Sequence, residues 1–275
     1  MMTADSLLFP SLSLTDVFVH IILTLFSTAF WVYIYRHRSF IFLALAMFFP
    51  TVFAFGIHIY HRSFIRFVSF LFLYPQWSTL FWSICSMLLP VIIVVICCLM
   101  NYLTGWGTFR QRNQLFSSVH EHNRNLFFGW IRALGEEIGW RSFLLPGLLI
   151  HFHPIIAFNI SGLVWGLYHV PVMILLSYRS ECKVQYPIRT IIVQCLSCWI
   201  SAILYGWIAI RCQYSMIPPT MMHFIWNQIN PSLLGSIYTN TPGLMDGEQW
   251  KINGEGLVGC IVHFIVALFI IFQFI

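Results

Sequence analysis

Two adjacent glutamates in the stretch GEEIGWR are the most unusual residues of this sequence. Glu136 and Glu137 lie deep in an apolar segment, whereas the other acidic residues fall in the tail, in loops or at segment edges. Carboxylates are costly inside a membrane, so both are functional candidates by default. Glu137 and Arg141 are four residues apart, which predicts an ion pair on one helix face. Glu136 points about 100° away and has no partner nearby in the sequence, which favours a functional role over a structural one.

Two histidines in later apolar segments are placed to work with these carboxylates. His169 ends a helix face that contains Gly162 and Gly166, and this spacing of small residues lets neighbouring helices approach closely. His223 and Asn227 are four residues apart and share a second face. A carboxylate beside imidazoles can move protons near neutral pH, so the sequence indicates acid–base chemistry.

The depths of these residues support one shared site. At ~1.5 Å of rise per residue, Glu136, His169, His223 and Asn227 lie at similar distances from the cytoplasmic ends of three segments. Four unusual polar residues on three helices therefore share one layer of the bilayer.

The composition indicates that these helices stand in lipid. The chain has 275 residues, of which 59% are hydrophobic and only 8% charged. Soluble domains carry about 25% charged residues. We expect an all-α fold, a polytopic membrane bundle of about eight transmembrane helices in a single domain over residues 1–275. The expected segments are Val17–Tyr35, Phe40–Tyr60, Trp77–Tyr102, Leu126–Ile150, Pro154–Tyr178, Ile188–Ile210, Met216–Gly235 and Gly256–Ile275.

One shorter segment and the basic residues of the loops complete the expected membrane topology. Ser63–Tyr74 is shorter, carries Arg66 and predicts an interfacial helix against the headgroups. Most basic residues outside the segments fall in loops on the same side as Arg36. The positive-inside rule then places both termini outside the cytoplasm. The predicted site faces the cytoplasmic side of a multi-pass membrane protein, in the bacterial cytoplasmic membrane, or in the endoplasmic reticulum if the source is eukaryotic.

Three motifs in this order resemble a known family. Glu136-Glu137-x-x-x-Arg141, then Trp165-x-x-x-His169, then His223-x-x-x-Asn227 are similar to the CPBP family of CAAX-processing and bacteriocin-processing (ABI-domain) membrane proteases. The type II CAAX prenyl endopeptidases are its best-known branch. Trp165 stands where the family commonly has phenylalanine, which keeps an aromatic wall. The resemblance makes residues 126–235 the catalytic core.

The resemblance implies an intramembrane endopeptidase. Glu136, helped by His169, would activate the water that attacks the scissile carbonyl. His223 and Asn227 would stabilise the oxyanion, while Glu137, Arg141 and Trp165 would support the site. The implied partners are membrane lipid and a hydrophobic or prenylated peptide or protein substrate, with no nucleic acid.

The cofactor stays open at the level of sequence. Glu136, His169 and His223 could form a zinc triad with an open fourth position. The same residues serve a metal-free glutamate mechanism equally well, so the prediction is either no cofactor or zinc.

Two functions from other classes remain as alternatives. A membrane transporter or proton path also uses buried glutamate and histidine, although no inverted repeat is visible. A non-catalytic immunity or scaffold protein could keep the fold, although the complete motif set argues against that. A rhomboid-type serine protease is disfavoured because Ser161 lacks its preceding glycine, and an aspartyl protease because no aspartate lies within a segment.

Overall fold

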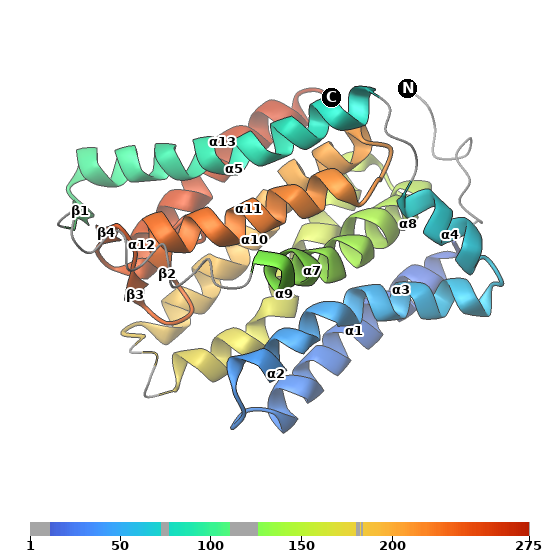
Figure 1. Cartoon of the computed structure of the whole chain (residues 1–275), viewed down its shortest axis with the longest axis horizontal. Coiled ribbons are helices and arrows are strands. Elements are labelled where there is room, and N and C mark those ends of the chain that lie inside the picture. The colour runs from blue at the N-terminus through green and yellow to red at the C-terminus, as the bar shows by residue number, and fades with distance from the viewer. Residues whose placement is uncertain (1–11, 73–76, 111–125, 180–181, 183, 275) are drawn as a thin grey trace.

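The computed structural model describes the whole chain except residues 1–11, 73–76, 111–125, 180–181, 183 and 275. Long helices form the described part, and only very short strands accompany them (Figure 1). In the first half these elements are α1 (Leu14–Ile34), α2 (Phe40–Ala44), the 3₁₀-helix η2 (Leu45–Phe48), α3 (Phe49–Tyr60), α4 (Phe64–Leu71), α5 (Trp77–Thr104) and β1 (Thr108–Phe109). The second half contains α7 (Leu126–Glu137), the π-helix η5 (Ile138–Leu144), α8 (Leu145–His151), α9 (Pro154–Ser177), α10 (Pro187–Arg211), α11 (Ile217–Leu233), β2 (Gly235–Ser236), β3 (Thr241–Pro242), β4 (Met245–Asp246), α12 (Gln249–Ile252) and α13 (Leu257–Ile271).

The expected all-α polytopic bundle is confirmed, but fewer helices than expected are long enough to span a membrane. Six helices of the described residues have the necessary length and composition. Two expected segments are not among them. Leu126–Ile150 is divided between α7, η5 and α8 and carries four charged residues. The other, α11, has 17 residues, fewer than the ~20 that a span needs. Both shorter helices carry predicted site residues.

Helix packing places the site-bearing helices at the centre of the bundle. Helix α9 packs along α10, while α11 packs against α5 and α7. A Cβ atom at Gly162 would lie 2.5 Å from the carbonyl oxygen of Trp199, and one at Gly166 2.7 Å from that of Cys195. Only glycine allows this approach, so the predicted close packing along that face is confirmed.

The segment after α11 is more ordered than a loop. Strands β2 and β3 form a short antiparallel hairpin, and β4 pairs with β1. These strands and α12 gather at one end of the bundle, at the left of Figure 1, opposite α4 and α8. The side chain of Asn253, buried here, donates to the carbonyl oxygen of Gly235 at 2.7 Å. This bond ties the end of α12 to strand β2.

Helix α4 covers the opposite end. It is shorter than the predicted interfacial segment, whose last residues lie outside the described part of the chain. Its residues Phe67, Phe70 and Leu71 are buried, whereas Ile65 is 81% exposed. The Phe67 ring stacks on His58 with ring centroids 4.0 Å apart. One face of α4 is thus part of the core.

Candidate functional site

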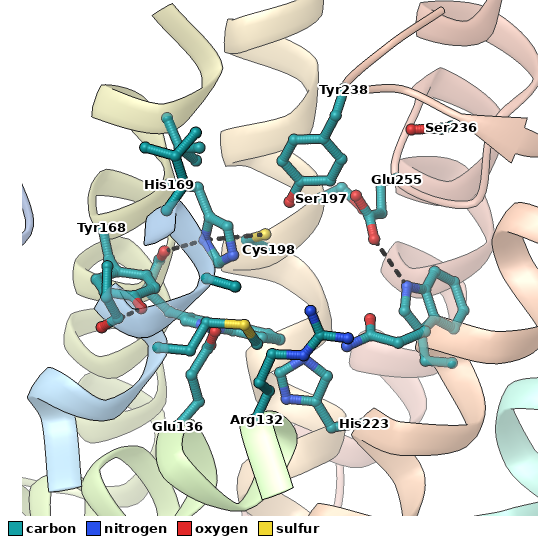
Figure 2. A pocket seen from close by; sticks show the side chains of 18 of the residues that line it. Arg132, Glu136, Tyr168, His169, Ser197, Cys198, His223, Ser236, Tyr238 and Glu255 are labelled. Atoms are coloured by element: carbon teal, nitrogen blue, oxygen red, sulfur yellow. Dashed lines mark hydrogen bonds between the residues drawn. The ribbon is translucent and has the colours of Figure 1, made fainter. Parts of the chain in front are cut away.

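One cavity is lined by Glu136, Trp165, His169, His223 and Asn227 of the predicted site residues, whereas Glu137 and Arg141 are not among its lining residues. Its volume is about 510 Å³, and it lies between α1, η2, α7, α9, α10 and α11 (Figure 2). In the view of Figure 2, Glu136, Arg132 and His223 lie along the lower side, and Tyr238 and Glu255 along the upper right. The polar side chains in its wall include Thr28, Arg132, Glu136, Tyr168, His169, Ser197, Cys198, Ser201, Tyr205, His223, Asn227, Ser236, Tyr238, Thr239, Glu255 and His263.

Indole groups hold the carboxylate of Glu136. This side chain is only 2% exposed. Its Oε2 atom accepts a hydrogen bond of 2.9 Å from Nε1 of Trp165 and a longer one of 3.4 Å from Nε1 of Trp140. Trp140 is one helical turn further along the same segment, so Glu136 has a local partner that the sequence analysis missed. Because both donors bind one oxygen, they fix the orientation of the carboxylate.

Glu137 forms a separate, buried ion-pair network. Its Oε1 atom lies 3.2 Å from Nη1 of Arg141 and 2.8 Å from Nδ1 of His223. The predicted pair between Glu137 and Arg141 is therefore present. The Arg141 guanidinium also lies 4.1 Å from the ring centroid of Trp165 and 4.6 Å from that of Tyr205. Two aromatic faces and one carboxylate thus compensate a fully buried cation.

The hydrogen-bond partner of His223 is Glu137, which the four-residue spacing of His223 and Asn227 did not indicate. The Nδ1 atom of His223 must donate, because the carboxylate of Glu137 can only accept. The Nε2 atom is then the ring nitrogen left for other contacts. The two adjacent glutamates have different tasks in this structure: Glu137 orients a histidine on α11, and Glu136 lines the cavity.

A π-helix begins directly after the two glutamates, at the point where their side chains turn to different partners. Residues Ile138–Leu144 form it between α7 and α8. A Cβ atom on Gly139 would lie 2.3 Å from Cβ of Pro50, so α3 is in direct contact with the backbone there. The Thr51 hydroxyl on α3 donates to the carbonyl oxygen of Gly135 at 2.6 Å. π-helical turns are rare and frequent at functional sites, and nothing in the sequence pattern predicted this one.

His169 is held by its own helix. Its Nδ1 atom lies 2.7 Å from the carbonyl oxygen of Trp165 one turn earlier. A carbonyl oxygen only accepts, so Nδ1 carries the hydrogen and Nε2 is the basic nitrogen of the neutral ring. The Sγ atom of Cys198 lies 3.8 Å from Nδ1. Asn227 lies one turn after His223 on α11, and both line the cavity.

The proposed zinc triad does not form a cluster. Within the described ranges, no three side chains of histidine, cysteine, aspartate or glutamate lie close enough together to hold a metal ion. Glu136, His169 and His223 face the same cavity, but one oxygen of Glu136 already accepts two indole hydrogen bonds. The donor geometry among the described residues does not fit a shared ion.

Several polar residues of the cavity wall were missed by sequence reasoning, among them Glu255, Tyr238 and Arg132. Glu255 is one of the acidic residues at a segment edge, and nothing in the sequence indicated that it belongs to the site, but its Oε1 atom accepts a 2.9 Å bond from Nε1 of Trp226 inside the cavity. Tyr238 accepts from Nε2 of Gln194 at 3.1 Å. Burial raises the pKa of Tyr238 well above its usual value, so its hydroxyl stays protonated. Arg132, on α7, is the third of these.

Comparison with known proteins agrees with the motifs. A family model described as type II CAAX prenyl endopeptidase Rce1-like matches residues 124–229. No curated protein matches the chain. The matched region contains Glu136, His169, His223 and Asn227, and the resemblance to the CAAX-processing proteases is confirmed.

Proposed function

We propose that this membrane protein, whose residues 124–229 carry the Rce1-like region of the type II CAAX prenyl endopeptidases, uses Glu136 and His169 to hydrolyse a peptide bond of a prenylated or otherwise hydrophobic substrate. The family match indicates a CAAX-type intramembrane endopeptidase. The observation that carries the mechanism is that Glu136, His169, His223 and Asn227, from three helices, line one cavity.

Glu136 is the proposed general base. Its carboxylate is buried at the cavity wall and oriented by indole N–H groups. A water bound against it would lose a proton to the carboxylate as it attacks the scissile carbonyl. Nε2 of His169, the basic nitrogen of that ring, would accept a second hydrogen bond from the same water, and the protonated Glu136 carboxyl would then return its proton to the leaving amine. The water and the scissile bond thus lie between α7 and α9.

His223 and Asn227 are the proposed oxyanion donors. Donation from Nε2 of His223 requires a ring protonated on both nitrogens, and the carboxylate of Glu137 on Nδ1 stabilises that form. The side-chain amide of Asn227 supplies a neutral donor one turn away. Removing one such donor elsewhere costs about 10²–10³ in kcat.

The apolar part of the cavity supports the substrate class. The side chains of Val32, Leu43, Met47, Val172 and Leu176 line it, next to the polar groups. Such a surface binds an isoprenoid or another apolar chain through buried area, while the polar groups position the peptide. A prenylated peptide presents both kinds of surface.

The test is peptide cleavage by the purified protein in liposomes. The substrate is a farnesylated CAAX peptide. The variant Glu136→Gln is compared with a control variant, Glu248→Gln. Glu248 forms a surface ion pair in which its Oε2 atom lies 3.2 Å from Nζ of Lys251. Loss of a general base predicts a fall in kcat of about 10²–10⁴ for Glu136→Gln and none for the control.

The same assay with phenanthroline tests the metal-free mechanism. We expect unchanged rates, because the described side chains offer no three-donor group. A loss of activity that zinc restores would refute the metal-free mechanism. Full activity in Glu136→Gln would exclude the role given to that residue, and a folded wild-type protein that cleaves no peptide would favour a transport or scaffold function.

A further inference from the structure

Arg132 is a cavity residue that the mechanism above does not use. It lies on α7 one turn before Glu136, and its partly buried side chain lines the cavity. Figure 2 shows its guanidinium directed into the pocket, in the same region as His223 and Glu136. Its Nε atom donates a 3.3 Å bond to the carbonyl oxygen of Phe128 on its own helix. The outer nitrogens of the guanidinium remain directed into the cavity.

The nearby carboxylates are already engaged with other groups. Glu137 binds Arg141 and His223, and Glu136 accepts from indoles. Among the described residues, no acidic side chain forms an ion pair with Arg132, and no other arginine or lysine lines this cavity. A partly desolvated guanidinium without an anion is costly. Its position beside the proposed general base therefore points to an anionic ligand as the missing partner.

We propose that Arg132 binds the C-terminal carboxylate of the peptide substrate. This inference rests on the proposed function, because it assigns the end of the peptide that Glu136 helps to cleave. A guanidinium binds a carboxylate through two parallel hydrogen bonds, which gives both strength and orientation. The site would select peptides whose cleaved bond lies close to a free C-terminus.

The spacing along α7 is compatible with a short peptide. Arg132 and Glu136 are four residues apart, which is ~6 Å along the helix. The long arginine side chain extends this reach. Two or three extended residues beyond the scissile bond span about 7–10 Å. A carboxylate at that distance from the attacked carbonyl can therefore meet the guanidinium while Glu136 faces the scissile bond.

Two peptides that differ only at the terminus test the proposal. A farnesylated CAAX peptide with a free carboxylate is compared with its C-terminal amide, for the wild type and for Arg132→Gln. We expect wild-type kcat/KM to favour the acid by roughly tenfold to a hundredfold, the effect of a hydrogen bond to a charged group. Arg132→Gln should lose this preference and cleave the amide as the wild type does. Arg66→Gln, an exposed arginine on α4, should keep the preference.

The outcomes separate this inference from the proposed function. The inference is overturned if the wild type cleaves acid and amide equally, or if Arg132→Gln lowers both rates by the same factor. A wild type that cleaves neither peptide contradicts the proposed function instead. In that case, or if Arg132→Gln does not fold, a binding test replaces the cleavage assay. The short C-terminal peptide that cleavage would release is added, either as the free acid or as the amide, to the wild type and to Arg132→Lys, and the unfolding temperature is measured. Stronger thermal stabilisation by the acid than by the amide, reduced in Arg132→Lys, supports the carboxylate subsite, and equal stabilisation overturns it.

Discussion

Removing Glu137 tests the buried ion-pair network most directly. Glu137 is fully buried and Arg141 is 1% exposed. In Glu137→Ala the guanidinium would keep its aromatic neighbours but lose its carboxylate, and His223 would lose the acceptor of its Nδ1–H. Breaking a buried pair by removing one partner costs about 3–5 kcal/mol, because a buried charge is left uncompensated.

That free energy corresponds to a measurable shift in thermal unfolding. For chains of this size, 1 kcal/mol moves the midpoint by about 2–4 °C. We therefore expect Glu137→Ala to unfold about 6–20 °C below the wild type. Intrinsic fluorescence of the detergent-solubilised protein reports the transition, since Trp140, Trp165 and Trp226 contact residues of the site.

Two further variants give this test its controls. Glu136→Gln keeps an oxygen acceptor for the Trp165 indole, so its midpoint should stay within about 2 °C of the wild type. The double variant Glu137→Leu/Arg141→Met removes both charges and should recover most of the stability without activity. The reasoning is refuted if Glu137→Ala is as stable as the wild type, or if the double variant is less stable than the single one.

Two other substitutions probe the packing around the site. Gly139→Ala should destabilise the fold by about 1–3 kcal/mol, because the new methyl group would overlap Pro50 of α3. The matched control is Gly56→Ala on α3, where nothing lies within 4 Å of the added Cβ atom. This control should be neutral or slightly stabilising in the same thermal unfolding assay. Trp165→Phe removes the 2.9 Å indole bond to Glu136 but keeps the aromatic wall, so we expect a loss of about 1–2 kcal/mol in stability with cleavage kept within tenfold. A hundredfold loss of cleavage would show that the catalytic role of the Glu136 carboxylate depends on the indole hydrogen bond.

Local spacing was enough to place several polar residues relative to one another. Residues four apart on a helix share a face, so the pairs Glu137–Arg141 and His223–Asn227 could be placed without a structure. The depth estimate likewise brought Glu136 and His169 into one layer, and the cavity contains both. These predictions depend only on helical periodicity and on the length of chain from each segment end.

Contacts between helices were beyond the reach of that reasoning. The spacing could not show that His223 binds Glu137 while the Trp165 indole binds Glu136. It also missed Glu255, which stood at the edge of an apolar segment and lies in the cavity wall. Which side chains meet across two helices depends on their rotation and crossing angle, and these follow from the packing of the entire bundle.

The sequence by itself determined that this protein is a helical membrane bundle and that Glu136, His169, His223 and Asn227 lie at similar depth in it, because apolar length and helical period are properties of each segment alone. Only the tertiary structure decided that the glutamate helix passes into a π-helix and that Gly139 contacts Pro50. It also decided that the two adjacent glutamates have different partners. Those features depend on close packing between segments far apart in the chain, where a shift of one ångström changes which donors and acceptors can meet.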